Sequence, residues 1–217
     1  VNFDDARAGR SWIVDGGSVS LDLRRGQTAI RGNFALLSGG ADVTAVSLNY
    51  ASPRGSRTAR VGLNLENVQA ADLAAQSPAL RWLQGVDAPI TAALRTELDA
   101  SGALGPLNAT LENGQGVLQP NPATQALAFD DAKAYFTYDP VRDSISFSEL
   151  SLQTEWGSLR ADGDAYLREF SDGLPRALLA QFQFSDVGLN PPGFFDSPPQ
   201  IPQAAVDLRL RFDPFSV

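Results

Sequence analysis

Apolar and polar residues alternate in two stretches near the C-terminal end of the chain. In residues 177–186, Phe182 and Phe184 alternate with Gln181 and Gln183. In residues 205–214, four apolar residues alternate with four charged ones, namely Val206, Leu208, Leu210 and Phe212 with Asp207, Arg209, Arg211 and Asp213. Successive side chains of a β-strand point to opposite faces, so each stretch predicts a strand with one apolar and one polar face.

The same arrangement occurs earlier in the chain, where two alternating stretches flank an insert. Asn67-Val68 corresponds to Asp186-Val187, and the residues after the two inserts also correspond: Leu94, Leu98 and Asp99 with Leu208, Phe212 and Asp213. The second insert is slightly shorter. We interpret the pattern as one supersecondary unit used twice. This predicts a single elongated β domain over residues 1–217, built from two related units at about 18–99 and 144–213.

Turn signals separate the other short strands. Asp15-Gly16-Gly17 predicts a turn, because glycine tolerates backbone angles that tight turns require. Residues 144–147 and 150–154 predict one strand interrupted near Glu149. Between residues 69 and 84 the period of two is lost, and Ser77-Pro78 with Gly85 predicts a short helix over residues 77–84. The second insert, residues 190–203, is rich in proline and predicts a loop.

Together these patterns predict an all-β protein with mostly antiparallel strands. The expected architecture is a curved antiparallel sheet, an elongated half-barrel with an apolar groove, that carries one short helix. The predicted apolar face has the following members: Val19, Leu21, Leu23, Ile30, Phe34, Leu63, Leu65, Leu94, Leu98, Phe136, Tyr138, Phe147, Leu152, Phe182, Phe184, Leu208, Leu210 and Phe212. The same alternation fits either the closed core of a β-sandwich or barrel, or an open concave face that binds an apolar ligand.

Composition restricts the chemistry that this face serves. The 217 residues carry a net charge of −8 and contain neither histidine nor cysteine. The usual nucleophile–base pairs, thiol chemistry and nearly all transition-metal sites are therefore excluded, and we expect no enzyme activity, metal or cofactor. No run of basic residues occurs, which argues against nucleic acid as a partner.

Three acidic pairs are the remaining candidates for chemistry. Asp4-Asp5, Asp130-Asp131 and Asp162-Gly163-Asp164 supply oxygen atoms for Ca²⁺ or for an acid–base pair. Their spacing matches no EF-hand loop, and we expect ordinary turn residues, because aspartate is common in turns. The only lysine, Lys133, lies on the polar side of a predicted strand and is expected to be solvated.

The ends of the sequence suggest a piece of a longer protein. The chain begins at Val1 without methionine, and it ends just after Asp213-Pro214, a turn signal with no strand after it. It contains no apolar run of about 18 residues that would form a membrane-spanning helix. Any membrane anchor is then expected outside this chain, and an unpaired sheet edge would allow an edge-to-edge homodimer.

Three segments resemble the periplasmic region of AsmA-like proteins, in particular their YhdP-type and TamB-type relatives. They are residues 65–99 with the helix signal ending at Trp82-Leu83, residues 104–118, and residues 132–167 with the Tyr138-Asp139-Pro140 turn. The repeat of the same pattern up to Phe215 adds to the resemblance. It implies a taco-shaped β-sheet whose groove carries phospholipid acyl chains between the inner and outer membranes of a Gram-negative bacterium. It also implies a periplasmic location, with an inner-membrane anchor in the full-length protein.

Two other functions remain open at this point. The main alternative is a structural or adhesive β-sandwich domain of a secreted or surface protein with a closed core. A polysaccharide hydrolase needs two carboxylates and no histidine, but no spacing in the sequence pairs them. Carbohydrate binding would favour exposed aromatic side chains on the polar side of the strands, for which Tyr135 and Trp156 are the candidates.

Overall fold

One antiparallel sheet of thirteen strands makes up most of the computed structural model. The structure describes residues 1–6, 10–23, 26–37, 43–75, 78–119, 125–171, 175–189, 200–212 and 215–216. The strands of the large sheet are β1 (Asn2–Asp5), β2 (Arg10–Asp22), β3 (Gln27–Leu37), β4 (Val43–Pro53), β5 (Thr58–Gln69), β7 (Pro89–Asp99), β8 (Leu107–Asn113), β11 (Asp131–Asp139), β12 (Ser144–Thr154), β13 (Gly157–Arg168), β14 (Ala177–Leu189), β15 (Gln200–Phe212) and β16 (Phe215–Ser216).

Three short strands form a second, small sheet, and two helical segments complete the described structure. The small sheet has the order β10-β9-β6, from β6 (Val86–Asp87), β9 (Gly116–Leu118) and β10 (Leu127–Phe129). The helical segments are α1 (Ala70–Ala74) and the 3₁₀ helix η1 (Pro78–Gly85). Both lie between β5 and β6, so we call residues 70–85 the helical insert.

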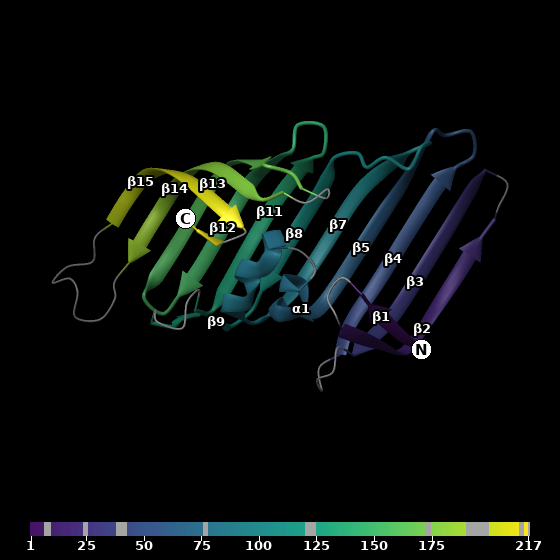
Figure 1. Ribbon diagram of the computed structural model, residues 1–217, viewed down its shortest axis with the longest axis horizontal. Helices are drawn as coiled ribbons and strands as arrows, with labels where there is room; N and C mark the ends of the chain where they lie inside the picture. Colours follow the sequence, from purple (N-terminus) through teal and green to yellow (C-terminus); the bar gives the residue numbers. More distant parts are fainter. Residues whose placement is uncertain are drawn as a thin grey trace.

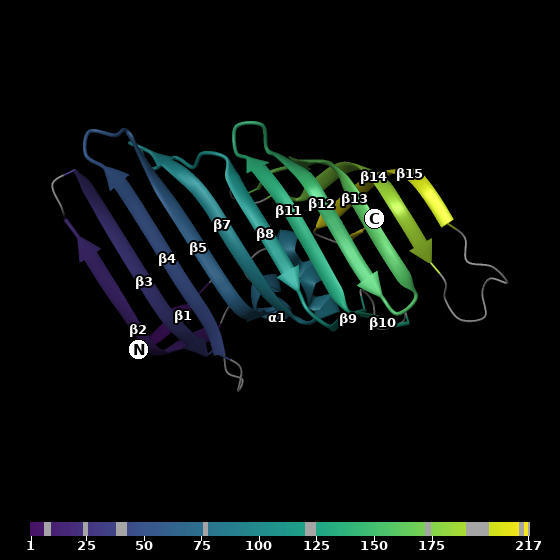
Figure 2. The same cartoon turned by 180° about the vertical axis from the view of Figure 1, so that it is seen from behind.

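The large sheet is a meander in which the strands follow one another in chain order (Figures 1 and 2). Each strand pairs with the one before it and the one after it in this order, always antiparallel, as short connections require. Strands make up 75% of the structure, and the sheet does not close into a barrel. The predicted all-β class with a curved antiparallel sheet is therefore confirmed. A sandwich needs two large packed sheets, which the described strands do not form.

Two irregular strands test the predicted turns. The turn expected at Asp15-Gly16-Gly17 is wrong, because β2 runs through these residues and only shifts register between Val14 and Gly16. A β-bulge of this kind absorbs the extra residue without reversing the chain. The strand interruption predicted near Glu149 is confirmed, since β12 is one strand whose register with β13 shifts between Phe147 and Leu150.

The helical insert is larger than predicted. The 3₁₀ helix Pro78–Gly85 lies where a helix over residues 77–84 was expected, and α1 precedes it. Ser77, the predicted cap, lies outside the described residues. In the second insert, residues 190–199 lie outside them too, but the loop expected up to residue 203 is wrong at its end, because β15 begins at Gln200.

Both inserts follow a strand with a bulge. β5 shifts register against β7 just before Val68, where Asn67 has a positive φ of 61°. The Thr44 hydroxyl donates to the Asn67 carbonyl at 3.2 Å, which ties the bulge to β4. β14 shifts register against β13 just before Gly188, next to Val187. The first shift is against the following strand and the second is against the preceding one, so the two bulges are not equivalent, and the proposed internal repeat stays a prediction.

The aromatic side chains of β12 and β14 meet across β13. The rings of Phe147 and Phe182 lie with their centroids 5.5 Å apart, although both residues pair with Gly163 on the strand between them. A Cβ atom on Gly163 would lie 2.9 Å from the Cα of Phe182 and closer still to the Gln181 carbonyl oxygen. Ala161 and Ala165, on the same side of β13, are also small and buried. Small residues here leave room for the sheet to curve over β13.

We expect Gly163→Ala to destabilise the fold by about 1–3 kcal/mol, the usual cost of forcing an extra group into a packed site. The backbone of β14 would have to move, and the ring contact over β13 would be lost. The measurement is the free energy of unfolding in urea. Gly188→Ala is the control, because a Cβ there meets nothing within 4 Å. Equal stability of the two variants would contradict this account.

Candidate functional site

One face of the large sheet carries a continuous row of apolar side chains. Residues paired directly across neighbouring strands lie on the same face, so the registers define the row. From β2 to β15 it consists of Val19, Gly32, Leu48, Leu63, Leu94, Ala109, Phe136, Phe147, Gly163, Phe182 and Val206. The row has no polar side chain, and we call the face on which it lies the apolar face.

A parallel row on each side makes the apolar face wider. One consists of Gly17, Phe34, Val46, Leu65, Ala92, Leu111, Ala134, Leu150, Ala161, Phe184 and Ala204. The other contains Leu21, Ile30, Tyr50, Val61 and Thr96 in the N-terminal half, and Leu107, Tyr138, Ile145, Ala165, Ala180 and Leu208 in the C-terminal half. Thr96 is the one polar residue in these two rows besides the Tyr50 and Tyr138 hydroxyls.

The registers bring nearly all predicted residues onto this face. Leu98, Leu152 and Leu210 lie on it just beyond the three rows, opposite Ala59, Ala132 and Leu178. Leu23 follows the end of β2 and is exposed. Phe212 ends β15, and its side chain lies outside the described residues. The rings of Phe136, Phe147 and Phe182 form a chain of contacts, with centroids 5.5 Å apart at each step.

Sequence reasoning missed several members of the face. Val46, Leu48 and Tyr50 alternate with polar residues in β4, a signal that was present in the sequence. Leu111, Ile145 and Leu150 were also missed, two of them beside a register shift or a strand end. Alanine and glycine members carry little hydrophobic signal of their own. Only the pairing of these residues with apolar residues on neighbouring strands assigns them to the apolar face.

Much of the apolar face is open to solvent. Val19 and Leu21 are 65% and 60% exposed, and Val206 at the opposite edge is 42% exposed. Among the described residues no large side chain is fully buried. The accessible surface is 13677 Å², whereas a compact monomer of this mass has about 9,700 Å². The excess is what a sheet without a covering second layer would produce.

The helical insert covers one part of the apolar face. Ala70, Ala74 and Leu83 of the insert are buried together with Ile90 of β7, which is 3% exposed. Leu111 of β8 packs against the same cluster. The insert lies in front of the sheet in Figure 1 and behind it in Figure 2, so it sits on one face only. It also lies close to β15. The covered part is therefore a small core, and the most exposed large apolar side chains of the face lie on the two edge strands, β2 and β15.

The opposite face is polar and held by hydrogen bonds between neighbouring strands. The Ser47 hydroxyl donates to the Asn33 side-chain oxygen at 2.9 Å, the Thr137 hydroxyl to that of Asn108 at 2.9 Å, and the Ser146 hydroxyl to Asp164 at 2.6 Å. Each of these bonds joins residues directly opposite in register. They fix the polar face as the solvent-facing side of the sheet.

The candidate chemical residues have structural roles on the polar face. Lys133 forms an ion pair with Asp131 at 3.2 Å, and this hydrogen bond and charge raise the pKa of the lysine. The Tyr135 hydroxyl donates to Glu112 at 3.0 Å, and the carboxylate raises the pKa of the tyrosine. Tyr135 and Trp156 are half-buried, so neither is the exposed aromatic side chain that carbohydrate binding would favour.

The acidic pairs do not all lie in turns. Asp162 and Asp164 lie inside β13, Asp131 begins β11, and Asp4 and Asp5 lie in β1, so the turn assignment is wrong for these five residues. Asp131, Asp162 and Asp164 alternate with apolar-face residues, which places them on the solvated side. Asp130 does lie just before a strand, and Asp4 accepts a hydrogen bond from the Ser11 hydroxyl at 2.5 Å. In the described part of the chain no three His, Cys, Asp or Glu residues are grouped so that they would hold a metal ion.

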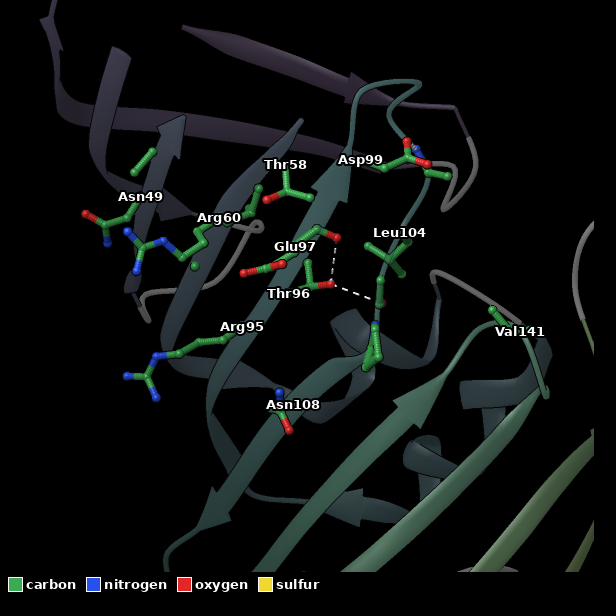
Figure 3. A pocket seen from close by; sticks show the side chains of 16 residues that line it. Asn49, Thr58, Arg60, Arg95, Thr96, Glu97, Asp99, Leu104, Asn108 and Val141 are labelled. Carbon is green, nitrogen blue, oxygen red and sulfur yellow. Dashed lines mark hydrogen bonds between the residues drawn. The ribbon is translucent and has the colours of Figure 1, made fainter. Parts of the chain in front are cut away.

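A shallow hollow of about 810 Å³ lies over the ends of β4, β5 and β7 (Figure 3). Its charged and amide side chains belong to the polar face: Asn49, Arg60, Arg95, Glu97, Asp99 and Asn108. The segment from Ala103 to Pro106 forms one wall. Val61 and Thr96 of a flanking apolar row also line the hollow, which therefore reaches the border of the apolar face, and its mixture of charges selects no single ligand.

Comparisons with known proteins do not identify the chain. No protein-family model matches it, no curated protein matches it, and no solved structure matches it. Within the described residues, no helix is both long and apolar enough to cross a membrane. The function must therefore be argued from the arrangement of the two faces.

The turn after β7 predicts a pH effect. The Asp99 carboxylate accepts hydrogen bonds from the Ser101 hydroxyl at 2.6 Å and from the backbone N–H groups of Ser101 and Ala103 at 2.8 and 2.9 Å. These bonds, that of the Ser101 hydroxyl first, lower the pKa of Asp99 below its usual 3.8. A lowered pKa means that the turn is stabilised above pH 3.8 and loses this stabilisation as the pH falls through the pKa of the folded state.

We therefore expect the amide resonances of Ser101 and Ala103 to shift with a midpoint below pH 3.8 in an NMR titration. The Asp99→Ala variant removes the acceptor and should abolish the transition. A transition with its midpoint above 3.8 would show that the carboxylate is not held by these donors.

Proposed function

We propose that the apolar face binds the acyl chains of phospholipids, and that the protein is a non-enzymatic, groove-forming segment of a lipid-conducting envelope protein. The observation that carries the proposal is the row from Val19 to Val206, which crosses eleven strands without a polar side chain. The resemblance to AsmA-like proteins in residues 65–99, 104–118 and 132–167 supports the same function.

The shape of the face favours a long, flexible apolar ligand. The central row has no hydrogen-bonding side chain that would orient a compact ligand, as small-molecule sites usually have. An acyl chain needs neither. Each CH₂ group that leaves water for the face contributes about 0.8 kcal/mol, so the affinity grows with the length of chain in contact. A charged headgroup would remain in water at the open side.

The proposed mechanism is passive. The chain would move along a surface of nearly uniform apolarity, without a covalent step, and no residue is assigned a catalytic role. The polar face, closed by its own hydrogen bonds, would face solvent. The periplasmic location and the inner-membrane anchor outside this chain are part of the proposal and rest on the resemblance alone.

We expect phospholipid to co-purify with the protein and to be lost in the Leu94→Asp variant. Leu94 lies in the middle of the central row, and burying a carboxylate beneath an acyl chain is costly because the charge loses its water. The measurement is native mass spectrometry of the intact protein, with lipid extraction of the same sample. Far-ultraviolet circular dichroism establishes that the variant keeps its strands.

Arg95→Asp is the matched control, because Arg95 is the next residue and lies on the polar face. It introduces the same side chain and should leave the bound lipid unchanged. A wild-type protein that carries no phospholipid, takes up none from vesicles and binds no dye for exposed apolar surface would refute the proposal. So would equal lipid loss in the two variants.

A further inference from the structure

The outer edge of β2 is only partly covered. β1 pairs with β2 from Arg10 to Ile13, and the backbone of Val1 exchanges hydrogen bonds with Val14 in both directions at 2.7 and 3.0 Å. Beyond Val14, the strand pairs with β3 on its inner side, and no described residue pairs with its outer side. Each unpaired N–H and C=O group along such an edge is available to another strand.

The side chains of this segment are the most exposed apolar members of the sheet's strands. Val19 is 65% and Leu21 60% exposed on the apolar face, and Leu23 just beyond the strand is more exposed still. The polar side alternates with them as Ser18, Ser20 and Asp22. From residue 16 to residue 22 there is no proline, lysine or arginine, the residues by which edge strands usually prevent pairing.

The opposite edge of the sheet has such protection. β15 contains Pro202, which has no N–H to donate, and it carries the charged residues Asp207, Arg209 and Arg211. In addition, β16 folds back and pairs with Arg211 and Phe212. The two ends of the meander are therefore unequal, and only the β2 edge has the composition of a pairing surface.

We propose that the β2 edge pairs with the β2 edge of a second copy of this chain, as an antiparallel, two-fold symmetric dimer. A two-fold axis perpendicular to the sheet keeps both apolar faces on the same side. With the axis at Ser20, Val19 of each copy lies opposite Leu21 of the other, and Ser18 lies opposite Asp22. The strand is thus complementary to itself, with no like charges directly opposite.

The proposed dimer joins the two apolar faces into one floor. The central row of each copy, which begins at Val19, meets the flanking row of the other, which begins at Leu21, and exposed apolar area is buried there on pairing. The seam, by which we mean the paired stretch of the two β2 edges, is short. The interface is therefore smaller than the roughly 1,200 Å² of stable complexes, and we expect a weak dimer with a dissociation constant in the micromolar range. The inference does not depend on lipid binding.

Val19→Lys tests the edge. Analytical ultracentrifugation of the full chain over the micromolar range should show a monomer–dimer equilibrium for the wild type, weakened on the order of tenfold in the variant by like charges across the seam. Val206→Lys is the matched control, because Val206 ends the same row at the other edge. It should dimerise like the wild type. A monomeric wild type, or a dimer weakened only by Val206→Lys, would overturn the proposal.

A spin label locates the seam independently of stability. The chain has no cysteine, so Ser20→Cys and Arg209→Cys each give a single labelled position. The label at residue 20 should show strong dipolar broadening between copies, and the label at residue 209 should show none. Broadening at residue 209 alone, or at neither position in a dimeric sample, would place the contact elsewhere and refute the β2 seam.

Discussion

The antiparallel backbone ladder is the interaction on which the rest of this structure depends. A sandwich or helical domain gains most of its cohesion from a core between two layers, but this sheet has no second layer over most of its area. Its order comes instead from hydrogen bonds between successive strands and from side-chain pairs across them. Because the strands of the large sheet pair in the order in which they occur along the chain, this sheet extends without a crossover.

Curvature of the sheet comes from small residues on one face. Side chains on the concave side of a bent sheet crowd together, so a strand at the bend needs little volume there. β13 meets this need with Ala161, Gly163 and Ala165. The missing side chain at Gly163 also lets Phe147 and Phe182 touch across a whole strand. The same residues that permit the bend thus connect the aromatic part of the apolar face.

The two faces of the sheet differ in the interactions that they make. Hydrogen bonds between registered side chains join neighbouring strands on the polar face, where Lys133, Asp162 and Asp164 also lie. The helical insert covers the apolar face at Ile90 and Leu111, whereas Val19, Leu21 and Val206 at the two edges of the face are exposed. An open apolar surface of this extent is unfavourable in water unless something binds to it. Acyl chains would cover it along its length, and a second copy would cover its exposed edge at β2.

The sequence by itself determined the class of the fold and the face of almost every residue in the predicted apolar set. Alternation with a period of two is a local property of a strand. It therefore does not depend on the position that the strand takes in the sheet. The sequence also determined that the chain has no histidine or cysteine side chain to offer to a site. Only the tertiary structure showed that the described strands form one large sheet that does not close into a barrel, because an open sheet and a closed one produce the same alternation. It likewise decided that Asp15-Gly16-Gly17 forms a bulge and that the helical insert lies over Ile90. These outcomes depend on which strands become neighbours, and local patterns carry no information about partners distant in the chain.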